Sequence, residues 1–194
     1  PLQMHYDRLH IQELQHAIAT SEDQQAYAEL FARFAPQLIR FTKAIVQQQE
    51  VAEEIVSDVF IRIWEKRKSL DHVQHLKMYL YVSARNFSLN YLRSKNRQFA
   101  LQVEQLDLDM ASFYADPHEE AVGSELRHEL LSAVQQLPDR CKMIFKLVKE
   151  DGLKQKEVAE LLHLSPKTVE NQLAIALKKL AEAVQAAALF RVKK

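Results

Sequence analysis

The 194-residue sequence contains only two glycines, Gly123 and Gly152, and a single cysteine, Cys141. So few glycines exclude the glycine-rich phosphate loops of nucleotide enzymes and leave too little for the tight turns of an all-β fold. One cysteine excludes an internal disulfide and a cysteine-rich zinc site, and it is typical of a reducing cytoplasm. We therefore expect an all-α, cytoplasmic protein.

Membrane and catalytic signals are also missing. No apolar run approaches the roughly 20 residues of a membrane span, and the polar start PLQMHYDRLH is not a signal peptide. The eight histidines form no HExxH motif and no triad order, so His5, His10 and His16 are expected to be surface residues and not metal ligands. We expect no enzymatic activity, no metal or other cofactor, and no small-molecule substrate.

The formal net charge is zero, which argues against a protein that coats nucleic acid by electrostatics alone. The charges are nevertheless unevenly distributed. Residues 1–97 hold 13 Lys and Arg against 11 Asp and Glu, residues 98–124 hold none against 6, and residues 125–194 hold 13 against 9. Because residues 98–123 also lack a sustained period, we expect a flexible acidic linker there, between a domain at 1–97 and a domain at 124–194.

The C-terminal block has the pattern of a helix-turn-helix. Apolar spacing predicts a short helix over Lys154–Leu162, and Ser165 and Pro166 then suit the N-cap and first position of another helix. The small Ala159 permits close approach of the two helices. An ordinary helical hairpin is the alternative. The cap at Ser165, the small side chain of Ala159 and the apolar spacing all favour the DNA-binding motif. The apolar residues expected on the inner face of the second helix are Val169, Leu173, Ala176, Leu177 and Leu180.

The opposite face of this second helix is available for DNA. Asn171 suits an adenine edge in the major groove, and Lys167 and Lys178 suit guanine or phosphate. Ahead of the motif, we expect helices over about Ser124–Gln136 and Arg140–Lys149, the second ended by a left-handed glycine cap at Gly152. The C-terminal block is thus predicted to be a four-helix unit.

The N-terminal block begins with two strongly apolar helices. Ser21 with Gln24 resembles a capping box, and a long helix follows that Pro36 should kink or split. The next helix, about Val51–Glu65, has an unusually wide apolar stripe. It is either a central core helix or a surface that docks a partner protein alongside Asp58, Arg62 and Glu65, and the sequence leaves both open.

Residues 66–75 are basic and polar without an apolar period, so we expect a functional loop. In the helix after it, the expected buried stripe is Leu76, Leu80, Ala84, Phe87 and Tyr91, and a separate face carries Lys77, Tyr81, Arg85 and Ser88. Amides and further cations follow at Asn86, Asn90, Arg93, Lys95 and Arg97. This mixture suits single-stranded nucleic acid, but a solvated helix face explains it equally well.

The order of these parts resembles a known family. DVFIRIWEKR, YLYVSARNFSLNYLR, an acidic spacer and QLPDRCKMIFKLVKEDGLKQKEVAELLHLSPKTVENQLAIALKKL are similar to the extracytoplasmic-function (ECF, group IV) sigma factors of bacterial RNA polymerase. The SPKTVEN run resembles the Bacteroidetes members in particular. The resemblance implies a region 2 domain and a region 4 domain joined by a linker, and a transcription initiation factor that directs core polymerase to −10 and −35 promoter elements and assists melting.

The resemblance also implies residue roles. The −35 reader would comprise Ser165, Lys167, Thr168, Glu170, Asn171, Gln172 and Lys178. The −10 and melting surface would comprise Lys66, Lys68, Asp71, His72, His75, Tyr81, Arg85, Asn86, Asn90 and Arg93, with residues 66–75 receiving a flipped base and Asn86 at the base-contacting asparagine. The polymerase clamp would meet Asp58, Arg62, Trp64 and Glu65.

Two further expectations concern partners and strength of binding. Relatives often carry a basic residue where Gln172 and Ile175 stand, so this −35 helix is electrostatically weak. The family norm implies a membrane-bound anti-sigma factor beside core polymerase and promoter DNA. The alternative is a response-regulator-like transcription factor, whose C-terminal helix-turn-helix is similar. It would need an N-terminal receiver domain with alternating strands.

Overall fold

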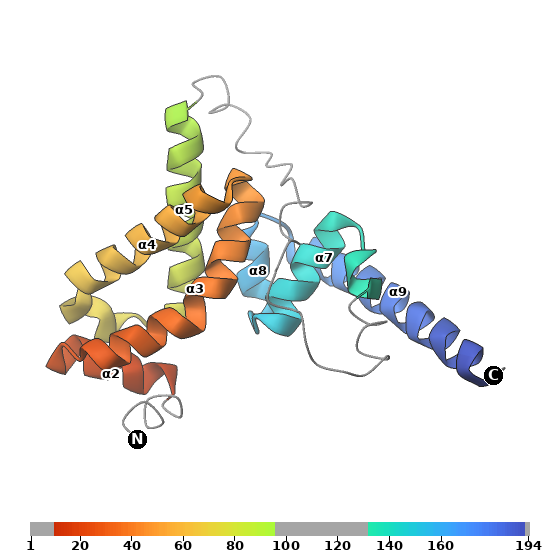
Figure 1. The fold of residues 1–194 in the computed structure, drawn as a ribbon, viewed down its shortest axis with the longest axis horizontal. Coiled ribbons are helices and arrows are strands. Elements are labelled where there is room, and N and C mark those ends of the chain that lie inside the picture. The colour runs from red at the N-terminus through yellow and green to blue at the C-terminus, as the bar shows by residue number, and fades with distance from the viewer. Residues whose placement is uncertain (1–9, 96–131, 193–194) are drawn as a thin grey trace. The chain divides into compact units, whose positions relative to one another are not determined.

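The computed structural model describes residues 10–95 and 132–192, apart from the side chains of residues 184 and 186–192. All regular structure in these residues is helical, as predicted (Figure 1). The chain divides into two compact units, Pro1–Leu108 and Asp109–Lys194. The linker predicted at 98–123 and the domain boundaries beside it lie outside the described residues. None of the described helices combines the length and apolarity that crossing a membrane requires.

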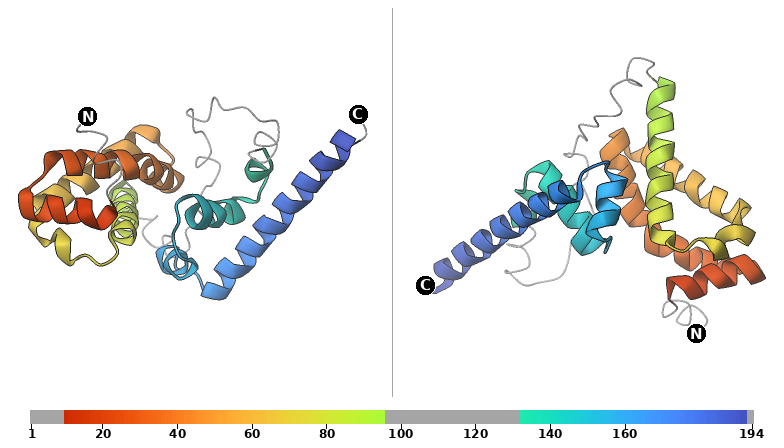
Figure 2. Two further views of the ribbon diagram at one scale, coloured as in Figure 1. Left: turned by 90° about the horizontal axis from the view of Figure 1, so that it is seen from below. Right: turned by 180° about the vertical axis from the view of Figure 1, so that it is seen from behind.

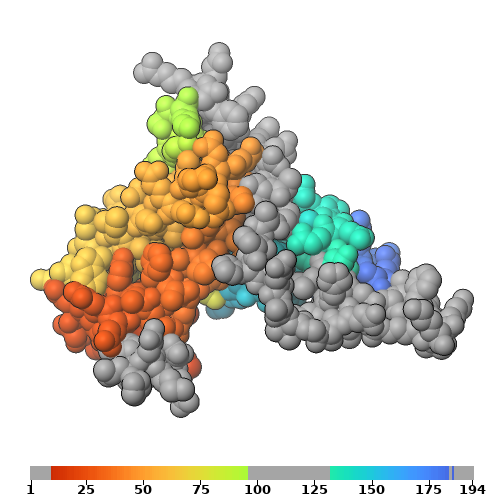
Figure 3. All heavy atoms as spheres, viewed as in Figure 1, coloured from red at the N-terminus to blue at the C-terminus, as the bar shows by residue number. Residues whose placement is uncertain are grey.

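The N-terminal unit comprises α2 (Ile11–Ser21), α3 (Gln24–Val46), α4 (Gln49–Glu65), the 3₁₀ helix η1 (Arg67–His72) and α5 (Leu76–Lys95). Helix α3 is central, since it packs against α2, α4 and α5 (Figures 1 and 2). In the space-filling view α2, α3 and α4 lie side by side on one face of this unit (Figure 3). Its largest fully buried side chains include Tyr81, Phe34, Phe41, Phe60, Leu14, Ile18, Leu30 and Leu38.

The start of α3 corrects the predicted capping box. Ser21 is the last residue of α2, a helix absent from the predictions, and Asp23 is the N-cap of α3. The Asp23 carboxylate accepts hydrogen bonds from the backbone N–H groups of Gln25 (2.9 Å) and Ala26 (3.0 Å). Pro36 does not split α3, which is continuous for 23 residues, and the ribbon bends along its length (Figure 1).

The segment between α4 and α5 is also more regular than predicted. Instead of an irregular loop, it forms η1, and the Leu70 side chain is buried at 3% exposure. The absence of an apolar period misled the prediction because one apolar side chain suffices to anchor a single short turn. Helix α2 supplies the surface against which η1 packs.

The C-terminal unit contains a helical stretch at 132–135, α7 (Asp139–Phe145), the π-helical turn η6 (Lys146–Glu150), α8 (Gln155–Leu161) and α9 (Pro166–Val192). The helix predicted over Arg140–Lys149 is therefore an α-helix that widens into a π turn. Gly152 has φ 71°, which confirms the predicted left-handed cap. Of the helix predicted over Ser124–Gln136, only the last residues fall within the described part of the chain.

Candidate nucleic-acid interface

Helices α8 and α9 form the predicted helix-turn-helix. Helix α8 ends at Leu161, and His163 takes a left-handed conformation (φ 52°) that reverses the chain. Ser165 Oγ then accepts a hydrogen bond of 3.0 Å from the backbone N–H of Thr168, which caps α9. Ala159 is 3% exposed, and its carbonyl accepts from the Leu164 N–H at 2.8 Å, so a small side chain lies at the tight turn as expected.

The inner face of α9 is narrower than predicted. Val169, Leu173, Ala176 and Leu180 are buried, but Leu177 is 44% exposed. Helices α7 and α8 pack on the side of α9 that carries Ala176. Leu177 is the next residue and is rotated by about 100° around the helix axis, so it lies away from that side. An apolar residue that was assigned to the core therefore lies at the surface, as does Ile175 at 42% exposure.

The outer face of α9 is polar and exposed. Lys167, Asn171 and Lys178 are all exposed. Lys167 Nζ lies 2.9 Å from Glu170 Oε2, an exposed pair that contributes little to stability. Within the described residues the Asn171 side chain has no hydrogen-bond partner, so its amide is available to an incoming group.

Gln172 differs from its neighbours on α9. Its side chain is half-buried, and its Oε1 accepts a hydrogen bond of 2.9 Å from Cys141 Sγ on α7. Cys141 is 2% exposed, and burial raises the pKa of its thiol. Gln172 thus links the recognition helix to α7 through its amide oxygen, and its assignment to the DNA-facing set stays a prediction. The Ser165 hydroxyl caps the helix and also lies 2.8 Å from the Thr168 hydroxyl.

The face of α5 that carries Tyr81 is buried, contrary to prediction. Tyr81 and Ser88 are both 0% exposed, and the Tyr81 ring lies 5.2 Å from the Phe41 ring between centroids. Helix α5 packs against both α3 and α4, so a wide part of its circumference is buried. This part includes Tyr81 and Ser88 as well as Leu80 and Ala84. Tyr81 is therefore a core residue, and we remove it from the candidate nucleic-acid contacts.

The remaining candidates on α5 form a polar surface. Asn86, Asn90 and Arg93 are exposed, and Arg85 is half-buried. Burial, and secondarily repulsion by Arg93, lowers the pKa of the Arg85 guanidinium. Neither arginine has an acidic partner among the described residues. Two cations left together without a counter-ion are typical of a surface that binds anions.

The candidates before α5 surround η1. Lys66, Lys68, Asp71, His72 and His75 are all exposed, so each can reach a ligand. Asp71 also has an internal contact, because its Oδ1 lies 3.1 Å from His16 Nδ1 on α2. The structure therefore places these five side chains on a short structured turn next to the start of α5.

The end of α4 carries the candidate protein-docking residues. Asp58, Arg62 and Glu65 are exposed, whereas Trp64 packs between Tyr27 (5.0 Å between ring centroids) and the Arg67 guanidinium (4.8 Å from the Trp64 ring centroid). Apolar surface lies beside them, since Ile61 is 55% and Phe31 is 39% exposed. An open hollow is lined by Gln24, Tyr27, Ile61, Trp64 and Glu65. Helix α4 is thus both a core helix and an apolar surface that is open to solvent.

The described residues contain no group of three or more His, Cys, Asp and Glu side chains arranged to hold a metal ion. Residues 10–95 contain no strand, so the receiver domain that the response-regulator alternative requires is not formed there. The candidate functional surfaces of the described chain are thus the polar faces of α5 and α9, the residues around η1 and the exposed end of α4.

Comparison with known proteins agrees with this division. Residues 30–98 match the family description "Sigma-70 region 2", and residues 127–180 match "Sigma-70, region 4". The two matched segments contain α5 and the helix-turn-helix, respectively. Together they define the chain as a transcription initiation sigma factor. Proteins of this class are initiation factors and not catalysts.

The relatives narrow the class further. The chain is 23% identical over 158 residues to the ECF RNA polymerase sigma factor SigW of Bacillus subtilis, covering 78% of this chain and 84% of that protein. It is 30% identical over 178 residues to the Xanthomonas campestris pv. campestris protein named "Probable RNA polymerase sigma factor RfaY", covering 88% of this chain but 44% of that protein. The chain belongs to the sigma factors of the ECF type.

A solved structure shares the fold. The sigma factor RpoE from Bartonella quintana, solved in complex with the anti-sigma factor NepR, matches with a TM-score of 0.51 at 18% identity. The match covers 82% of this chain and 96% of that chain.

Proposed function

We propose that this chain binds core RNA polymerase and directs it to promoters, with the N-terminal unit acting at the −10 element and the C-terminal unit at the −35 element. The observation that carries the proposal is the polar face of α5, on which Arg85 and Arg93 have no acidic partner among the described residues and share the helix with the exposed amides of Asn86 and Asn90. Phosphates would relieve the repulsion between the two guanidinium groups. The amides would then face bases that have left the duplex stack.

At the −35 element, α9 enters the major groove of intact duplex. An α-helix fits this groove, and the exposed row of Lys167, Asn171 and Lys178 offers one amide for base edges and two cations for guanine or phosphate. Glu170 lies on the same exposed face and pairs with Lys167. Because Gln172 is bonded to Cys141, base contacts would come from Asn171 and its exposed neighbours.

The polymerase clamp docks on the end of α4. Asp58, Arg62 and Glu65 supply charges around the apolar Ile61 and Trp64, and an apolar centre with a polar rim is typical of protein interfaces. A sigma factor in complex with an anti-sigma factor is known from the Bartonella quintana protein, and we propose a membrane-bound anti-sigma factor for this chain too. We also propose a cytoplasmic location, membership of group IV, and a place among the Bacteroidetes members.

Reconstituted transcription tests the proposal. The full chain is added to core RNA polymerase with a candidate promoter and with matched templates in which the −10 or −35 element is scrambled. We expect transcripts that start at one position and require both the chain and each element. Arg93→Gln should weaken initiation, whereas the exposed Gln25→Ala, remote in sequence on α3, should not. Sequence-specific DNA binding without any requirement for polymerase would contradict the proposal and favour an ordinary repressor or activator.

A further inference from the structure

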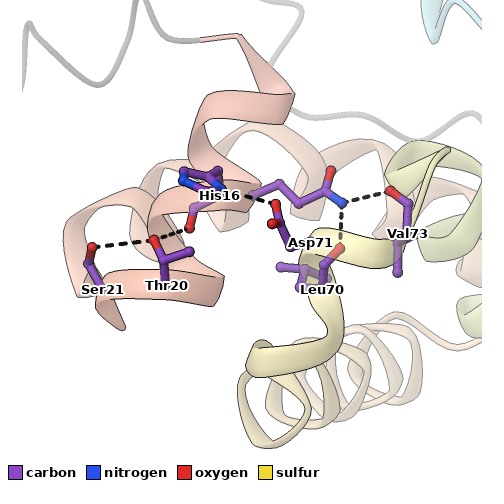
Figure 4. A network of polar contacts seen from close by, with 7 residues as sticks. His16, Thr20, Ser21, Leu70, Asp71 and Val73 are labelled. Carbon is purple, nitrogen blue, oxygen red and sulfur yellow. Dashed lines mark hydrogen bonds and ion pairs between the residues drawn. The ribbon is translucent and has the colours of Figure 1, made fainter.

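Helix α2 holds the turn between α4 and α5 through a buried glutamine. Gln15 is 5% exposed, and its Nε2 donates hydrogen bonds to the carbonyl of Leu70 (2.5 Å) and to the carbonyl of Val73 (2.7 Å). Figure 4 shows Leu70, Asp71 and Val73 facing the helix that carries His16, Thr20 and Ser21. The two bonded carbonyls bracket Asp71 and His72, which are both exposed. Gln15 therefore restrains the backbone on each side of two candidate base contacts.

The chemistry of this contact requires an amide nitrogen. A primary amide has two N–H groups on one nitrogen, so a single side chain can serve two carbonyl acceptors. An apolar side chain in the same place would leave both carbonyls without this donor, and a carboxylate would repel them. Gln15 is thus matched to the backbone of η1 and not merely packed against it.

Two other contacts hold the same turn at its surface. His16 Nδ1 lies 3.1 Å from Asp71 Oδ1, and Glu22 Oε2 lies 3.0 Å from a terminal nitrogen of Arg67. The His16 and Asp71 side chains are 64% and 45% exposed, so this pair is weakened by solvent. The buried Gln15 contact is therefore expected to dominate the conformation of the turn.

We propose that Gln15 is a positioning residue for −10 recognition. By binding the carbonyls of Leu70 and Val73, it fixes the backbone in which Asp71 and His72 meet the extruded base. This inference rests on the proposed function, and within it on the expectation from the family resemblance that residues 66–75 receive the extruded base. It adds that selectivity for that base depends on a helix from a distant part of the sequence, since Gln15 and Leu70 are 55 residues apart.

The test uses Gln15→Met, which retains length and volume but removes both donors, and Gln15→Glu, which retains the shape and cannot donate when ionised. Gln12→Met is the control, because Gln12 is exposed on the same helix. Each full-length protein is bound to core polymerase on templates that carry each of the four bases at the extruded −10 position. Permanganate footprinting measures the opened fraction. Hydrogen exchange of the backbone amides of residues 66–75 reports on the turn itself.

The base selectivity is the ratio of the opened fraction on the best of the four templates to that on the worst. We expect this ratio to be the same for the wild type and for Gln12→Met. Both Gln15 variants should narrow it by about fivefold or more, the effect of about one hydrogen bond, and should show faster amide exchange in the turn. The response to −35 substitutions should stay unchanged. If neither variant folds, Gln15→Asn, which keeps the amide but shortens its reach by one methylene group, gives the same readout.

The two ideas fail in different ways. Unchanged base selectivity in the Gln15 variants, with a selective wild type, would overturn the role of Gln15 and leave the proposed function intact. Equal loss of opening on all four templates would also overturn it, because that is the result of a merely structural role. A wild type that opens all four templates equally would instead overturn the assignment of residues 66–75 to base recognition.

Discussion

Replacing the two exposed asparagines separates the tasks of the two units. Asn86 on α5 and Asn171 on α9 are exposed, and neither side chain has a hydrogen-bond partner among the described residues. Their replacement by alanine removes no side-chain hydrogen bond that the described residues make. Since alanine has the higher helix propensity, each unit should become slightly more stable, by up to about 0.7 kcal/mol. Any loss of function would then reflect a lost contact with DNA.

The expected magnitudes follow from what each amide meets. In intact duplex, Asn171→Ala removes one bidentate base contact, which should cost about 1–3 kcal/mol, or roughly 5-fold to 150-fold in affinity, and relax preference at one −35 position. It should not alter strand opening once the complex has formed. Asn86→Ala should leave closed-complex affinity unchanged but lower the opened fraction, because base extrusion costs a few kcal/mol that the protein must return.

Binding to duplex templates measures closed-complex affinity. Permanganate footprinting on duplex and on pre-melted templates measures the opened fraction. Pre-melted −10 DNA should restore much of the activity of Asn86→Ala and none of the loss in Asn171→Ala. Gln25→Ala and Gln136→Ala serve as controls, since both residues are exposed amides outside the proposed interfaces, one in each unit. If Asn86→Ala left the opened fraction unchanged while Asn171→Ala reduced it, the assignment of tasks to the two units would be wrong.

Three further outcomes are expected. The free protein should bind promoter DNA weakly, and core polymerase should strengthen binding by orders of magnitude in a titration, because the net charge is zero and Gln172 stands where the family resemblance leads us to expect a cation. Tyr81→Ala should lower the free energy of unfolding of the N-terminal unit by about 3–5 kcal/mol in thermal or urea denaturation, because Tyr81 is a core residue; a stable variant with a selective DNA defect would refute this. Cys141 should react with a thiol reagent at pH 8 only as the C-terminal unit unfolds, because its side chain is 2% exposed and burial raises the pKa of its thiol. Rapid labelling of the folded protein would contradict this.

Local patterns were sufficient where the determining contacts are close in sequence. The cap at Ser165, the glycine at Gly152 and the helix-turn-helix itself were all predictable, because each depends on residues within a few positions of one another. The buried positions Val169, Leu173, Ala176 and Leu180 follow from a period of 3.6 in the same way.

Predictions failed where two or more helices share one surface. Tyr81 was placed on an outward face of α5, but α3 and α4 both pack on that helix and bury it. Leu177 was placed in the core, but the neighbours of α9 do not extend far enough around it. Amphipathic periodicity indicates which side of a helix is apolar, but the width of the buried arc depends on how many neighbours the helix has.

Helix α2 could have been predicted from the sequence, but the residues that it contacts could not. Ile11, Leu14 and Ile18 recur at helical spacing, and Leu14 and Ile18 are fully buried, so the helix itself was predictable. Its partner was not. Gln15 is a polar residue whose burial depends on two carbonyls that lie 55 and 58 positions away, and no local pattern identifies them.

The sequence by itself determined the all-α class, the helix-turn-helix and the polar surfaces from which the family could be inferred, because helix propensity, capping and periodicity act over a few residues. Only the tertiary structure decided which of those polar side chains face solvent. It buried Tyr81, tied Gln172 to Cys141 and ordered η1 against α2. The reason is that burial and hydrogen-bond pairing depend on surfaces brought together from distant segments, and a side chain is free for DNA only where no such surface covers it.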